Sequence, residues 1–98
     1  MLFQQIAVLS ELLKLAETKE NNDQEIYQVT HILGDLYWSL GKQYDSLAVY
    51  EKNLNIKKRP ANEDKMMLIN RYLRTGGLFW NSGKHDKAFQ NYQECLRL

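Results

Sequence analysis

Residues 34–42 read GDLYWSLGK, and residues 76–84 read GGLFWNSGK. The second stretch repeats the first at an offset of 42 residues, and the agreement continues toward the C-terminus. The identical or similar pairs at this offset are Gly34 and Gly76, Leu36 and Leu78, Tyr37 and Phe79, Trp38 and Trp80, Gly41 and Gly83, Lys42 and Lys84, Tyr50 and Tyr92, and Leu54 and Leu96. Similarity at a fixed period of a few tens of residues is typical of proteins that stack copies of one structural unit. The sequence therefore predicts a repeat architecture.

The apolar residues follow helical spacing almost throughout, and no stretch alternates for long enough to predict a strand. We expect five helices, at residues 2–18, 23–42, 44–58, 63–82 and 85–98. Asn22 or Asp23 can cap the second helix and Asn62 the fourth, because their side chains accept hydrogen bonds from exposed backbone amides. Gly41 is expected to end the second helix, and Pro60 to stop the third. The predicted fold is all-α.

The repeated glycines have two different predicted uses. Gly41 and Gly83 stand where a first helix must turn back, which is a common position for glycine. Gly34 and Gly76 stand inside helices, where glycine costs about 0.5 to 1 kcal/mol relative to alanine. We expect that cost to be offset by close approach of the paired helix, with the large aromatic side chains of the repeat filling the space between the partners.

The first predicted helix matches the second helix of a later pair. At an offset of 41 residues, Ala7, Leu9, Leu13 and Leu15 fall on Ala48, Tyr50, Leu54 and Ile56. The chain is thus predicted to contain residues 1–20 as the second helix of a truncated repeat, followed by helix pairs at 22–60 and 62–98. We expect residues 1–98 to be a single domain or a fragment of one. Apolar residues on the last helix predict self-association through exposed terminal repeat faces.

The motifs of the two pairs resemble those of the tetratricopeptide repeat family. Residues 33–37, LGDLY, stand where the family has Leu-Gly-x-x-Tyr, and residues 88–92, AFQNY, stand where it has Ala-x-x-x-aromatic. Thr30, Ser46 and Thr75 depart from the pattern, replacing a tryptophan, an alanine and a leucine. The 42-residue period is similar to the longer repeats of the kinesin light chain-like variety. The resemblance implies antiparallel helix pairs stacked into a right-handed superhelix, an α-solenoid.

The resemblance also implies a binding face, because in this family the first helix of each pair lines a concave groove that binds extended or helical peptides. The residues implied for that groove are His31, Asp35, Trp38, Ser39, Lys42, Leu73, Gly77, Trp80 and Asn81. Trp38 and Trp80 hold the same place in both units. They are expected either to contact a partner or to pack between neighbouring first helices.

Two functions are compatible with this resemblance. The first is a non-enzymatic protein–protein interaction scaffold that presents the concave helical groove to a peptide or partner-protein segment. The alternative is a regulatory or sensor repeat module of a larger signalling protein, which binds a peptide signal or a neighbouring domain. The motifs that carry the resemblance are packing motifs, so they predict the fold more directly than the ligand.

Few residues have the spacing that catalysis or metal binding requires. His31 and Asp35 stand at i and i+4, as a base and its orienting carboxylate or half of a metal site would. No serine, cysteine or further histidine stands at the matching positions one unit later. The pair Gly76-Gly77 lacks the lysine spacing of a phosphate loop, and Cys95 is expected to act as a small hydrophobic residue. We therefore predict no catalytic residue, no metal site, no cofactor and no enzymatic activity.

Composition and charge narrow the class of partner. The 98 residues are 44% hydrophobic and 26% charged with a single proline, a balance typical of a folded chain. The net charge of +1 gives no field that would attract nucleic acid or an anionic membrane. No apolar run is long enough to span a bilayer, and the N-terminus lacks the features of a signal peptide or presequence, so a cytoplasmic location is expected. A protein or peptide partner remains.

The charge is unevenly distributed along the chain. Residues 1–50 hold three lysines and seven acidic residues, whereas residues 51–98 hold ten basic and five acidic residues. The basic triplet at residues 57–59 is expected to lie in the last turn of the third helix, where cations complement the helix dipole.

Overall fold

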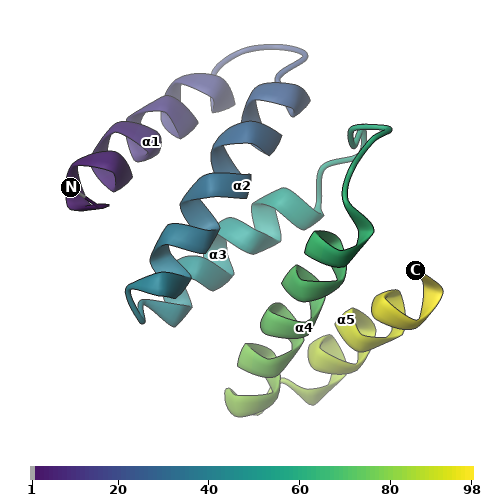
Figure 1. The fold of residues 1–98 in the computed structure, drawn as a ribbon. Coiled ribbons are helices and arrows are strands. Elements are labelled where there is room, and N and C mark those ends of the chain that lie inside the picture. The colour runs from purple at the N-terminus through teal and green to yellow at the C-terminus, as the bar shows by residue number, and fades with distance from the viewer. Residues whose placement is uncertain (1) are drawn as a thin grey trace. The chain divides into compact units, whose positions relative to one another are not determined.

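The computed structural model describes residues 2–98, which fold into helices joined by short connections (Figure 1). The helices are α1 (Leu2–Glu17), α2 (Asp23–Ser39), α3 (Gln43–Leu54), α4 (Lys65–Asn81) and α5 (His85–Arg97). The described residues contain no strand, so the all-α prediction is confirmed. The chain divides into two compact units, one ending at Pro60 and the other formed by Ala61–Leu98. α1, α2 and α3 belong to the first unit, and the antiparallel pair of α4 and α5 forms the second.

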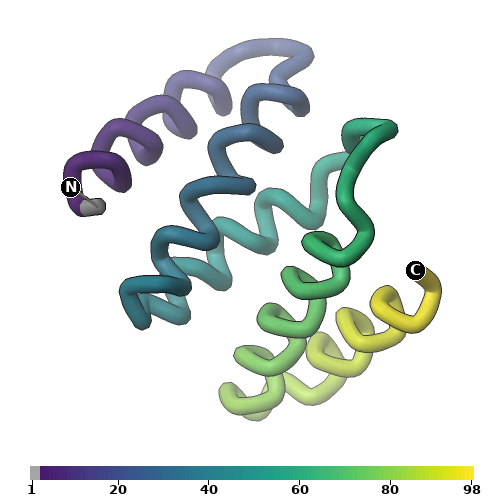
Figure 2. Tube along the Cα trace, in the orientation of Figure 1, coloured from purple at the N-terminus to yellow at the C-terminus, as the bar shows by residue number. Residues whose placement is uncertain are grey.

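α2 and α4 end in the same hydrogen-bonded turn. After α2, the backbone N–H of Gly41 donates to the carbonyl of Trp38 over 3.0 Å, and that of Lys42 donates to Tyr37 over 2.9 Å. This pair of bonds is the Schellman motif, which needs one residue in the left-handed region, and Gly41 has φ +74°. Residues 79–84 repeat both bonds at the same distances. The repeated Gly-Lys dipeptide therefore reverses the chain twice, and α2 ends three residues before the predicted position 42 (Figure 2).

The glycine inside α2 lies directly against a ring of α3. Tyr50 is fully buried, and a Cβ placed on Gly34 would lie only 2.6 Å from its Cε1 atom. The Tyr50 hydroxyl donates a hydrogen bond to Asp35 over 2.6 Å, and the buried Ser46 hydroxyl donates to the carbonyl oxygen of Gly34 over 2.8 Å. The expected close approach of the paired helices is thus present. Ser46 stands where the family has an alanine, and its hydroxyl is satisfied by a backbone carbonyl of α2.

The first unit has a core to which all three of its helices contribute. Leu13 of α1, Leu33 of α2 and Val49 of α3 form its buried centre. Partly buried apolar side chains pack around this centre, namely Ile6, Leu9, Ile26, Val29 and Tyr37. α1 is therefore an integral part of the first unit.

Buried polar side chains replace aromatic packing at one end of the α2 and α3 pair. Thr30 and Asn53 are both fully buried, and the Asn53 amide donates to the Thr30 hydroxyl over 3.0 Å. That hydroxyl donates in turn to the carbonyl of Ile26 over 2.6 Å. The Arg59 guanidinium donates to the Asn53 side-chain oxygen over 2.9 Å and also to its backbone carbonyl. Position 30, where the family has a tryptophan, thus holds a threonine that is hydrogen-bonded to Asn53, which is hydrogen-bonded in turn to Arg59.

The predicted end of the third helix is wrong. α3 ends at Leu54, because the chain leaves the helical path there and turns to bury Ile56. Residues 57–59 consequently lie in the connection to α4 and not in a last helical turn. Arg59 still meets the C-terminal end of α3, through the carbonyl of Asn53.

The predicted helix caps also need correction. α4 begins at Lys65, and its cap is Asp64, whose carboxylate accepts from the backbone N–H of Met66 over 2.8 Å, while Asn62 lies upstream of the helix. Asn22 holds the cap position of α2 without making a side-chain cap bond. Its amide instead donates to the carbonyl of Ala16 over 2.8 Å, and so binds the end of α1.

Adjacent glycines in α4 provide a matched test of this packing. A Cβ on Gly76 would lie 2.7 Å from the Tyr92 ring, so we expect Gly76→Ala to lower the free energy of unfolding by about 1–3 kcal/mol through overpacking. A Cβ on Gly77 would meet only the Tyr92 hydroxyl at 3.9 Å, so Gly77→Ala should raise stability by about 0.5–1 kcal/mol. Urea denaturation of the two single variants measures both effects. Changes of the same sign would contradict the packing described here.

Candidate functional site

An exposed apolar face runs along α4. Met66, Leu73 and Trp80 are all exposed and stand seven residues apart, which places them on one side of the helix. Gly77 lies between the last two, and because it has no side chain the face has a notch at this position, where a Cβ would contact only the Tyr92 hydroxyl at 3.9 Å. Asn81 is exposed beside Trp80. The residues predicted on α4 for the binding groove therefore share one face of the helix, on which Leu73, Trp80 and Asn81 are exposed and Gly77 is partly exposed.

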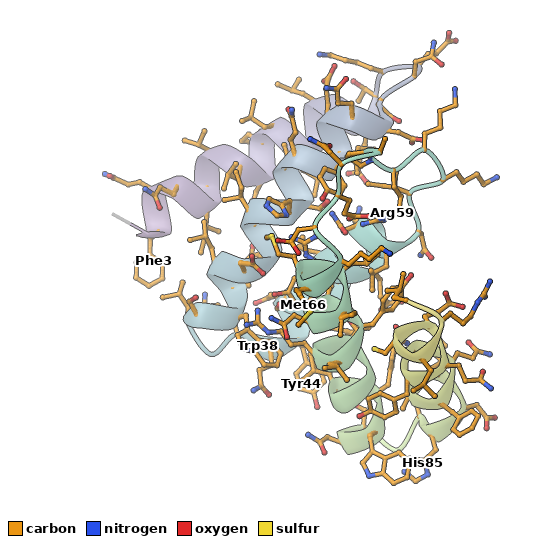
Figure 3. The ribbon with its side chains drawn as sticks, turned by 45° about the vertical axis from the view of Figure 1, so that its right-hand side comes forward. Phe3, Trp38, Tyr44, Arg59, Met66 and His85 are labelled. Carbon is orange, nitrogen blue, oxygen red and sulfur yellow. The ribbon has the colours of Figure 1, made fainter. Side chains whose placement is uncertain are left out.

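Trp80 is half exposed, at 53%, and its indole stacks on the imidazole of His85 with ring centroids 4.2 Å apart. Figure 3 shows His85 at the start of α5. His85 is exposed, and its ring covers part of the indole. Stacking of this kind restrains the position of the indole.

The residues predicted on α2 have more varied surroundings. The His31 ring stacks on Tyr27 at 5.6 Å, and the Arg59 guanidinium lies 5.4 Å from the centre of the same tyrosine ring. The carboxylate of Asp35 accepts the hydrogen bond of the buried Tyr50 hydroxyl. Asp35 and His31 are each partly exposed, so they border the outer face of α2 while contributing to packing within the unit.

The C-terminal end of α2 carries the other predicted residues. Trp38 is partly buried, and Ser39 is exposed. Lys42 lies beyond the helix, and its Nζ atom is 5.7 Å from the centre of the exposed Phe3 ring on α1. The position of Lys42 therefore depends on the turn that follows α2 and on its contact with α1.

Sequence reasoning missed Met66. Its signal was the seven-residue spacing that links it to Leu73 and Trp80, the spacing of one helix face. Tyr27 and Arg59 were missed as neighbours of His31, because their contacts depend on the path of the chain after α3.

The described residues offer little for metal or nucleophilic chemistry. They contain no group of three or more His, Cys, Asp or Glu side chains that could hold a metal ion. Burial raises the pKa of the Cys95 thiol, which keeps it protonated and weakly nucleophilic near neutral pH. Its Sγ donates to the carbonyl of Ile69 over 3.7 Å. None of the described helices combines the length and apolar character that a membrane crossing needs.

Comparison with known proteins agrees with the repeat geometry. The family model for the tetratricopeptide repeat matches residues 27–59 and 69–98, which include most of each helix pair. The chain belongs to the tetratricopeptide repeat family. No curated protein and no solved structure matches it. Tetratricopeptide repeats are in general protein–protein interaction modules and are typically non-catalytic, and the prediction of an all-α helical-repeat protein of this family is confirmed.

The two tryptophans should differ in solvent access. In the Trp38→Phe variant Trp80 is the only tryptophan, and in Trp80→Phe the only tryptophan is Trp38. We expect acrylamide to quench Trp80 more strongly, because about half of its surface is exposed whereas Trp38 is largely covered. Stern–Volmer constants of the two variants check this order. Stronger quenching of Trp38 would contradict the exposures described here.

Proposed function

We propose that this tetratricopeptide repeat protein is a non-enzymatic interaction scaffold, whose first helices present a concave groove to a peptide or partner-protein segment. The general role of the family in protein–protein interaction supports this proposal. The observation that carries it is the apolar face of α4, because large apolar side chains exposed together mark interaction sites.

The notch at Gly77 gives that face a means of recognition. Glycine in mid-helix costs stability, and no close packing requires it at position 77, because a Cβ there would make only an ordinary contact of 3.9 Å with the Tyr92 hydroxyl. A bulky apolar side chain of the partner fits between Leu73 and Trp80 and contacts the helix backbone there. The exposed Asn81 amide, which can both donate and accept hydrogen bonds, binds the peptide backbone beside the notch.

On α2 the proposed contacts are more polar. His31, Asp35, Ser39 and Lys42 offer hydrogen-bonding or charged groups, and Trp38 offers an aromatic anchor. We also infer a cytoplasmic location. The single cysteine of these residues cannot form an internal disulfide, which is compatible with a reducing compartment.

Peptides selected from a random display library against the intact chain test the groove. We expect Trp80→Ala to weaken the selected peptides by about 2 kcal/mol, or about 30-fold, because exposed aromatic anchors dominate such interfaces. The variant should stay folded, since about half of Trp80 is exposed. Gln90→Ala, an exposed position on α5, is the matched control and should bind normally. Unchanged binding by Trp80→Ala together with Trp38→Ala would contradict the proposal.

Self-association through terminal repeat faces is a separate expectation. Phe89 and Leu96 stand seven residues apart on α5 and are both largely exposed. We expect the sedimentation coefficient of the chain to rise with concentration, and Leu96→Glu to reduce that rise by placing a charge in the contact. A concentration-independent monomer would remove this part of the proposal.

A further inference from the structure

The two repeats differ at the residue that follows their shared Gly-Lys turn. In the first repeat this residue is Gln43, and in the second it is His85, at the same 42-residue offset that relates Trp38 to Trp80. The His85 ring lies on the Trp80 indole, with centroids 4.2 Å apart and planes at 28°. Both side chains are exposed. The second repeat therefore has a titratable ring in contact with the aromatic residue that the proposed function assigns to partner binding.

This stack restrains an exposed side chain. An indole that projects into water can occupy several rotamers, and a partner that binds one of them must offset the side-chain entropy that is lost. Contact with the His85 ring reduces this cost, because it restrains the Trp80 indole before the partner binds. Gln43 has no ring that could do the same for Trp38. His85 is thus a positioning residue for Trp80.

Charged groups surround His85 on its own turn of the chain. His85 lines a hollow of about 430 Å³ together with Gly83, Lys84, Asp86 and Lys87. Its three charged neighbours are all exposed, and they carry two positive charges and one negative charge. The helix that packs against α5 is α4, whose end adds no charge, because residues 77–82 contain no titratable side chain. A positive charge on His85 would therefore add to an existing surplus of positive charge.

We propose that His85 makes partner binding at the α4 face depend on pH, the neutral ring favouring an apolar partner segment and the protonated ring opposing it. The proposal rests on the proposed function, because it concerns a partner that covers Trp80. Such a partner also removes water from the ring that is stacked on the indole. A neutral imidazole tolerates that loss, whereas an imidazolium loses its hydration, and the two lysines beside it outnumber the one carboxylate.

In the free protein the same charge has the opposite effect. A cation over the face of an indole is attracted to the ring, and water still solvates the N–H groups of an exposed imidazolium. Protonation of His85 therefore strengthens its stack on Trp80 and weakens the complex with the partner. The two effects can be measured separately.

The first measurement follows the stack without any partner. In the Trp38→Phe variant the only tryptophan is Trp80, and contact with a protonated imidazole quenches indole fluorescence. We expect its emission to fall between pH 7.5 and pH 5.5, the range in which histidine gains its charge. The same variant with His85→Gln, which has the side chain of the first repeat, should not show this fall. No fall in the first variant, or an equal fall in both, would overturn the proposal.

The second measurement uses library peptides that are selected at pH 7.5 and weakened by Trp80→Ala. Peptides with blocked ends and without histidine or acidic residues are used, so that only the protein changes charge. We expect the parent chain to bind them about tenfold more weakly at pH 5.5, the change expected when only the neutral form of a histidine side chain binds. His85→Phe, which keeps a ring without a charge, should bind equally at both pH values. His31→Gln should keep the pH dependence, because it removes only the chain's other histidine.

Circular dichroism at both pH values checks that each variant is folded. Equal peptide affinity of the parent chain at the two pH values, or the same loss in His85→Phe, would overturn this inference and leave the proposed function intact. Peptide binding that does not depend on Trp80 or Trp38 would instead contradict the proposed function, and this inference with it. The two failures are distinguishable, because pH dependence is measured only on peptides whose binding depends on Trp80.

Discussion

The contact between a glycine and a tyrosine ring is the interaction on which each helix pair depends. Gly34 lets the Tyr50 ring lie against the backbone of α2, and Gly76 does the same for Tyr92. A mid-helix glycine costs about 1 kcal/mol, whereas burying an aromatic side chain of about 150–250 Å² at about 25 cal/mol per Å² stabilises by several times that amount. The close spacing that results is also what brings Asp35 within reach of the Tyr50 hydroxyl.

The features that could be predicted are those that recur in both repeats of the sequence. The glycines at 41 and 83 predict the reversals, and the glycines at 34 and 76 predict close packing, because each choice has one simple physical reason. Residues 73, 77, 80 and 81 were assigned to one helix face by the resemblance to the family. Their exposure then follows from the fold, because only one face of α4 packs on α5.

The features that could not be predicted depend on contacts between distant parts of the chain. The early end of α3 follows from burial of Ile56 and from the Arg59 guanidinium, and no local propensity specifies either. Asn22 looked like a cap for α2 and binds the end of α1, since an amide can donate as well as accept. The stacking of His85 on Trp80 depends on the turn that joins α4 to α5.

The hydrogen-bonded set of Thr30, Asn53 and Arg59 has a consequence for the history of the two repeats. The corresponding positions for Thr30 and Asn53 in the second unit are Tyr72 and Cys95. Replacing Thr30 or Asn53 alone with an apolar residue would leave the other with a buried polar group that lacks this hydrogen-bond partner. The two positions are therefore expected to change together. If the units arose by duplication, they have diverged to the point where α3 and α5 can no longer be exchanged, although their glycine–tyrosine contacts are alike. Both pairs thus keep the same glycine–tyrosine contact, but α3 is matched to α2 and α5 to α4 by other side chains.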